Sequence, residues 1–63
     1  MSNIRFIIVI IHRNGFNRLR SALDSVVNAS SPIDKIFIVD NASTDNSISR
    51  ILKIYKNITI IKN

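Results

Sequence analysis

The fold of this chain is decided by residues 35–47, which read KIFIVDNASTDNS. An apolar run rich in β-branched and aromatic residues ends at Asp40 and gives way to small polar residues, as expected where a buried strand reaches the edge of a sheet. Residues 43–46, Ser-Thr-Asp-Asn, then supply side chains that commonly cap the start of a helix. In open α/β sheets small ligands bind at such a corner, at the carboxyl end of a strand. We therefore expect a strand, a polar corner and a helix, with any functional site at the corner.

An earlier strand is predicted at residues 4–11, IRFIIVII. This run is almost continuously apolar rather than alternating, which is typical of a parallel sheet covered by helices on both faces. We expect this strand to be the central one. It ends at residues 12–15, where the only glycine of the chain, Gly15, permits a turn closed to other residues.

Two amphipathic helices separate the predicted strands. The stripe of the first comprises Phe16, Leu19, Leu23, Val26 and Val27, and that of the second comprises Ile48, Ile51, Leu52 and Tyr55. We expect Asn14 or Asn17 to cap the first helix and Leu23 to be its most buried residue. Asn57 is predicted to end the second helix, and residues 58–61, Ile-Thr-Ile-Ile, form a third short strand.

The predicted order β-α-β-α-β defines an α/β fold class, a Rossmann-like half domain with a three-stranded parallel sheet. Because parallel crossovers are almost always right-handed, both helices should pack on one face of that sheet. The other face is then bare, although strands this apolar suit cover on both sides. We therefore expect residues 1–63 to be one partial domain. Sequence beyond Asn63, another chain or self-association would cover the bare face.

The chain is short and basic. Its 63 residues carry a formal net charge of +5, have a pI of about 10.5 and include no cysteine, so no disulfide or thiolate metal site is possible. This charge suits a polyanionic partner. The cations are scattered, however, and solvated outer faces of helices account for them.

No membrane span or signal peptide is predicted. The apolar run at residues 6–11 is far shorter than the ~20 residues a spanning helix needs. His12 and Arg13 follow it at once, without a small-residue cleavage site. We expect the mature chain to start near Met1 and to be cytoplasmic.

The polar corner offers several candidate residues, each with two interpretations. Asp40 could accept a hydrogen bond from a ligand's ring N–H or ribose hydroxyl, or it could tie the two strand-end loops together. Asn41 could read the edge of a base or only turn the chain. Asp45 precedes a helix, where a carboxylate is stabilised without any function, and we expect it to cap.

His12 and Arg13 are the candidates at the end of the first strand. His12 is the only histidine, and it lacks a second His or Cys at metal-ligand spacing and a serine in a nucleophile-elbow context. It is therefore either a polar strand-end residue or a ligand contact, and Arg13 could pair with a diphosphate. One glycine excludes the Gly-rich dinucleotide fingerprint and the P-loop. We predict no catalytic residue and no metal ligand in this chain.

Two motifs together resemble the start of the family 2 glycosyltransferases. Residues 7–14, IIVIIHRN, resemble the family's opening strand, which ends in Thr-Tyr-Asn. Residues 38–47, IVDNASTDNS, resemble its second strand, which ends in Val-Asp-Asn-x-Ser-x-Asp-x-Ser, and Leu19, Leu23 and Ser25 match the helix between them. The members are inverting, nucleotide-sugar-dependent enzymes of the GT-A fold, and the rhamnosyltransferase-like branch is the most similar. The resemblance spans nearly the entire chain.

The resemblance implies a nucleotide site at the two strand ends. His12, Arg13 and Asn14 would lie near the base and phosphates, and Asp40 and Asn41 where the base is recognised. His12 and Arg13 replace the family's Thr-Tyr pair, so a usual stacking aromatic is missing.

The family's metal-binding Asp-x-Asp, catalytic base and acceptor half correspond to sequence beyond Asn63. For a full-length relative the resemblance implies a nucleotide-diphosphate sugar, a divalent metal (Mg or Mn), polysaccharide biosynthesis and a place peripheral to the inner face of the membrane. For this fragment we expect no cofactor of its own, weak nucleotide-sugar binding at best and no glycosyl transfer, because nothing would stabilise the leaving diphosphate or deprotonate the acceptor.

An alternative is a small basic interaction module that binds nucleic acid or a partner protein. The helix faces that carry Arg18 and Arg20, and Arg50, Lys53 and Lys56, would form its surface. Nucleic-acid binding through them would fall steeply with salt.

Overall fold

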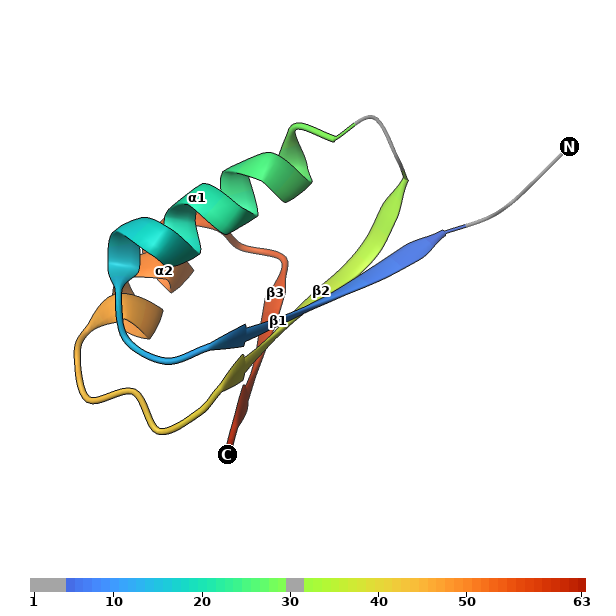
Figure 1. The fold of residues 1–63 in the computed structure, drawn as a ribbon. Coiled ribbons are helices and arrows are strands. Elements are labelled where there is room, and N and C mark those ends of the chain that lie inside the picture. Colours follow the sequence, from blue (N-terminus) through green and yellow to red (C-terminus); the bar gives the residue numbers. More distant parts are fainter. Residues whose placement is uncertain (1–4, 30–31) are drawn as a thin grey trace, which may run out of the picture.

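The computed structural model describes residues 5–29 and 32–63 of the chain. Three strands and two helices form in the predicted order within these residues. The elements are β1 (Phe6–His12), α1 (Phe16–Val27), β2 (Ile33–Asp40), α2 (Ser47–Ile54) and β3 (Ile58–Lys62), as Figure 1 shows. The α/β fold class is thereby confirmed. The predicted start of the first strand, Ile4, lies outside the described residues.

The sheet is parallel and its strands end level with one another. β1 pairs with β2 up to His12 opposite Asp40, and β2 pairs with β3 up to Asp40 opposite Lys62. The strand order is β1-β2-β3, so β2 and not β1 is the middle strand of the sheet that the described residues form. The prediction of a central first strand is wrong here, because two successive right-handed crossovers add each new strand on the same side.

Both helices lie on one face of the sheet (Figure 1) and bury the core there. Leu19 and Leu23 from α1, Ile38 from β2 and Ile51 from α2 are buried and pack together. Leu23 is fully buried, as predicted from its place in the stripe. At the start of α1, the Arg50 guanidinium lies 3.7 Å from the centroid of the Phe16 ring, a cation–π contact between the two helices.

The opposite face of the sheet is apolar and exposed. Alternate side chains of a strand point to opposite faces, and the residues that alternate with the buried ones keep much of their surface in solvent. The exposed fractions are 60% for Ile7, 58% for Val9, 74% for Ile11 and 47% for Ile61. The prediction of a bare face is confirmed for the part of the chain that the structure describes.

The helix ends differ from the prediction at two places. Gly15, and neither Asn14 nor Asn17, is the N-cap of α1. Gly15 has φ 101°, in the region that favours glycine, so the turn does need this residue. The helix α2 ends at Ile54 and not at Asn57, because only three residues remain in which the chain must turn back into β3.

Tyr55, expected on the stripe of the second helix, is extended instead and joins the two helices. Its hydroxyl donates a hydrogen bond to the Asp24 carboxylate of α1. This bond to a carboxylate raises the pKa of Tyr55. Leu52 and Val27 were also expected to be buried, but they are 40% and 52% exposed. Each lies at the edge of the apolar stripe of its helix, where the neighbouring layer covers it only in part.

Candidate functional site

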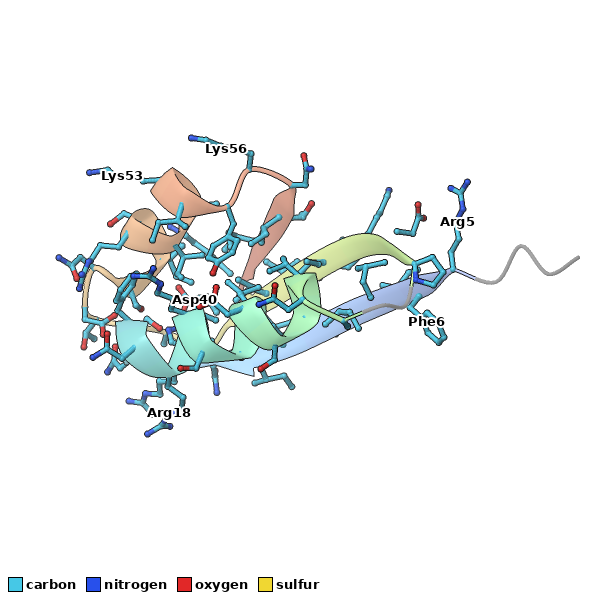
Figure 2. All side chains as sticks on the ribbon, turned by 90° about the horizontal axis from the view of Figure 1, so that it is seen from above. Arg5, Phe6, Arg18, Asp40, Lys53 and Lys56 are labelled. Carbon is cyan, nitrogen blue, oxygen red and sulfur yellow. The ribbon has the colours of Figure 1, made fainter. Side chains whose placement is uncertain are left out.

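The five candidate residues gather at the carboxyl edge of the sheet. His12 ends β1 directly opposite Asp40 at the end of β2, so the turn at residues 13–15 and the loop at residues 41–46 lie side by side. The Asn41 N–H donates to the His12 carbonyl over 2.8 Å. Figure 2 places Asp40 at this end of the molecule and Arg5 and Phe6 at the other.

Asn14 ties the two loops together. Its side-chain Oδ1 accepts hydrogen bonds from the backbone N–H of Thr44 (2.8 Å) and of Asp45 (3.2 Å). Its own backbone N–H donates to Ser43 Oγ over 3.0 Å. Asn14 has φ 53°, a left-handed conformation that asparagine tolerates better than most residues. Its side chain is thus engaged within the protein.

Asp45 links the two loops a second time, and its carboxylate accepts hydrogen bonds at the starts of both helices. Its Oδ2 accepts from the backbone N–H of Gly15 over 2.8 Å, at the N-cap of α1. Its Oδ1 accepts from the backbone N–H (3.1 Å) and the hydroxyl (2.5 Å) of Ser47, the first residue of α2. The Ser47 hydroxyl, and then the backbone N–H groups of Gly15 and Ser47, lower the pKa of Asp45 to about 2. The predicted helix-start role of Asp45 is met, although the N-cap of α2 is Asn46.

His12 and Asp40 are the two buried members of the site, with exposed fractions of 5% and 7%. The Nε2 atom of the His12 ring lies 2.8 Å from Ser47 Oγ. Asp40 Oδ1 accepts from the backbone N–H of Ser43 over 3.1 Å, which stabilises the turn after β2. Arg13 and Asn41 are exposed beside them.

A hollow of about 310 Å³ opens beside Asp40, between α2 and the ends of β2 and β3. Its polar lining consists of Asp40, Ser43, Asp45, Ser49 and Lys62. A larger hollow of about 400 Å³ lies at the other end of the strands, against the last turn of α1, and contains none of the candidate residues. The smaller hollow is therefore the one relevant to the site.

The sequence did not predict that Ser43, Thr44 and Ser47 would form hydrogen bonds with His12 and Asn14. All three are small polar residues after a strand, and that signal predicts caps and turns. It does not identify partners some 30 residues away in the chain, which depend on the register between β1 and β2.

Metal-ligating side chains do not cluster in the described residues. Within residues 5–29 and 32–63, no three side chains of His, Cys, Asp or Glu come together in a group that could hold an ion. Both oxygens of Asp45 are already engaged by N–H and O–H donors. In the same part of the chain, no helix has the length and apolar character that crossing a bilayer requires.

Ala42, in the loop after β2, has φ 58°, a left-handed conformation that costs a non-glycine residue about 1–2 kcal/mol. Ala42→Gly relieves this strain but frees the unfolded chain, which costs about 0.4–1 kcal/mol. We expect a net stabilisation of about 0.5–1 kcal/mol in urea unfolding. The control Ala22→Gly, within α1, should instead destabilise by about 1 kcal/mol. Equal losses from both variants would contradict this prediction.

The fold and site together define a class of protein. A parallel β-α-β-α-β unit with polar residues at the carboxyl ends of its strands is the Rossmann-like arrangement of the N-terminal half of the GT-A fold. Residues 7–63 match the sequence model of Glycosyl transferase family 2. The chain belongs to this family, which confirms the resemblance to family 2 glycosyltransferases at the level of the family. No curated protein and no solved structure gave a match.

Proposed function

We propose that the carboxyl edge of this sheet is the nucleotide-binding part of a cytoplasmic glycosyltransferase. Such an enzyme would transfer a sugar, with inversion, from a nucleotide-sugar donor to a glycan or other acceptor. The observation that carries the proposal is the pairing of His12 with Asp40 at the strand ends, in a chain of this family. Ligands of open α/β sheets bind at such an edge.

The residues of the edge have chemistry that suits a nucleoside diphosphate. Asp40 uses Oδ1 to hold its own turn, and its second oxygen can accept from a base N–H or a ribose hydroxyl. Arg13 is exposed and its guanidinium matches the geometry of phosphate oxygens. Asn41 offers both a donor and an acceptor. The ties made by Asn14 and Asp45 hold these groups in place before a ligand arrives, which lowers the entropic cost of binding.

Binding is tested on the 63-residue chain by NMR titration with UDP, GDP and dTDP. We expect at least one nucleotide to shift the amide signals of residues 12–14 and 40–41. Asp40→Asn should abolish this response while retaining the fold, because asparagine keeps the oxygen that accepts from Ser43. Lys53→Glu, an exposed change on α2, is the matched control and should bind as the wild type does. A lack of response to all three nucleotides would refute the proposal.

No observation favours the alternative of a nucleic-acid module. In Figure 2 Arg18 points to one side of the helix layer, whereas Lys53 and Lys56 point to the other. A polyanion bound there would shift signals on these helix faces rather than at the sheet edge, so the same titration made with an oligonucleotide distinguishes the two functions.

A further inference from the structure

Three side chains form a hydrogen-bonded chain that links β1 to α2. Asp45 Oδ1 lies 2.5 Å from Ser47 Oγ, and Ser47 Oγ lies 2.8 Å from His12 Nε2. Ser47 is fully buried and His12 is 5% exposed, so water is excluded from the contact between these two residues. This hydrogen-bonded series of side chains ends at His12, which pairs with Asp40 across the sheet.

The hydrogen-bond donors and acceptors among these three side chains can be assigned. Asp45 is ionised at neutral pH, because its pKa is lowered to about 2, and an ionised carboxylate only accepts. The single hydroxyl hydrogen of Ser47 therefore goes to Asp45. Ser47 Oγ then has only lone pairs left for the ring, so His12 Nε2 must carry the hydrogen that it shares.

The other ring nitrogen, Nδ1, is consequently an acceptor in the neutral ring. Among the described residues, no fully buried side-chain nitrogen or oxygen lacks a partner. Nδ1 forms no hydrogen bond within these residues, so solvent reaches it. Asp40, on the paired strand, adds a carboxylate to the same face of the sheet.

We propose that the Asp45–Ser47–His12 chain fixes the Nε2–H tautomer of His12, so that Nδ1 accepts a hydrogen bond from an N–H or O–H group of the bound nucleoside. This inference rests on the proposed nucleotide binding and specifies it further. The buried pair His12 and Asp40 offers acceptors, and phosphate oxygens are acceptors too. The pair therefore selects the base or ribose, and the phosphates bind away from it, near the exposed Arg13.

The tautomer is tested without any ligand. His12 is the only histidine, so the ring nitrogens of the 63-residue chain give a single set of ¹⁵N NMR signals. We expect the Nε2–H tautomer, with its ring N–H proton protected from exchange with water. Ser47→Thr should keep the signal, because the hydroxyl is retained, and Ser47→Ala should lose the protected proton. An Nδ1–H tautomer in the wild type would overturn the proposal even if no variant folds.

The ligand contact is tested with two probes, uridine and inorganic pyrophosphate. Uridine should shift the Nδ1 signal, pyrophosphate should leave it unchanged, and Ser47→Ala should weaken uridine binding about threefold to tenfold. If UDP binds at the edge but the Nδ1 signal does not respond to uridine, this inference fails and the proposed function stands. If GDP or dTDP binds in place of UDP, the matching nucleoside, guanosine or thymidine, replaces uridine in this test. If none of the three nucleotides binds, the contact fails together with the proposed function, whereas the tautomer result is unaffected.

Discussion

Replacing Leu23 by alanine is expected to remove about 2–5 kcal/mol from the free energy of unfolding. Leu23 is fully buried in a core of four buried apolar residues, so its truncation removes buried apolar surface and leaves a cavity. At about 0.05–0.15 kcal/mol per residue, a chain of this length has a total stability of about 3–9 kcal/mol. The substitution therefore approaches the whole stability of the fold.

The loss is measured by urea unfolding followed by far-UV circular dichroism, with the midpoint and slope fitted separately. Val27→Ala is the matched control, since Val27 lies on the same helix but is 52% exposed. We expect that control to change stability by less than about 1 kcal/mol. Equal effects of the two changes would mean that the α1 stripe does not pack on the sheet as described.

Acid is expected to destabilise the folded chain through Asp45. The folded pKa of Asp45 is about 2, below the ordinary value of 3.8, so ionised Asp45 stabilises the folded state. This contribution is complete above pH 3.8 and is lost as the pH falls towards 2, where the folded state also takes up the proton. The loss arises because one carboxylate accepts from Gly15 N–H, Ser47 N–H and the Ser47 hydroxyl together, and solvent screening reduces it because Asp45 is exposed.

Asp45→Asn should lower the urea midpoint at pH 7 and flatten the dependence of stability on pH between about 4 and 2. Asp34→Asn is the comparison, because Asp34 forms only an exposed ion pair with Arg5, at 3.2 Å, and such pairs contribute little. If the two variants lose stability in parallel over this pH range, the role of Asp45 at the two helix starts is wrong.

The order of elements follows from local patterns, and those patterns were sufficient to predict it. Continuous apolar runs predicted the strands, and the stripe containing Leu19 and Leu23 predicted the first helix, since both depend only on nearby residues. The position of β1 in the sheet was mispredicted, because an apolar run indicates burial and not the number of paired neighbours. The N-cap was mispredicted because Gly15 is held by Asp45, a residue 30 positions away.

The candidate site was predictable in its place but not in its connections. The carboxyl ends of the strands pointed to His12 and Asp40, which the register brings opposite each other. Nothing in the spacing of Asn14 indicated that its side chain would bond two backbone N–H groups of the next loop. The assignment of His12 and Asp40 to nucleotide binding remains a prediction, which the nucleotide titration tests.

The cross-bonded loops also limit how this region can change in length during evolution. Asn14 and Gly15 each meet a defined partner within residues 43–45, so one residue inserted into either loop would shift several hydrogen bonds at once. The connection at residues 55–57, at the other end of the sheet, is tied to α1 at Tyr55, whose hydroxyl bonds to Asp24. Insertions and deletions should therefore be tolerated better after Tyr55 than at the corner, which keeps a fixed number of residues in both of its loops.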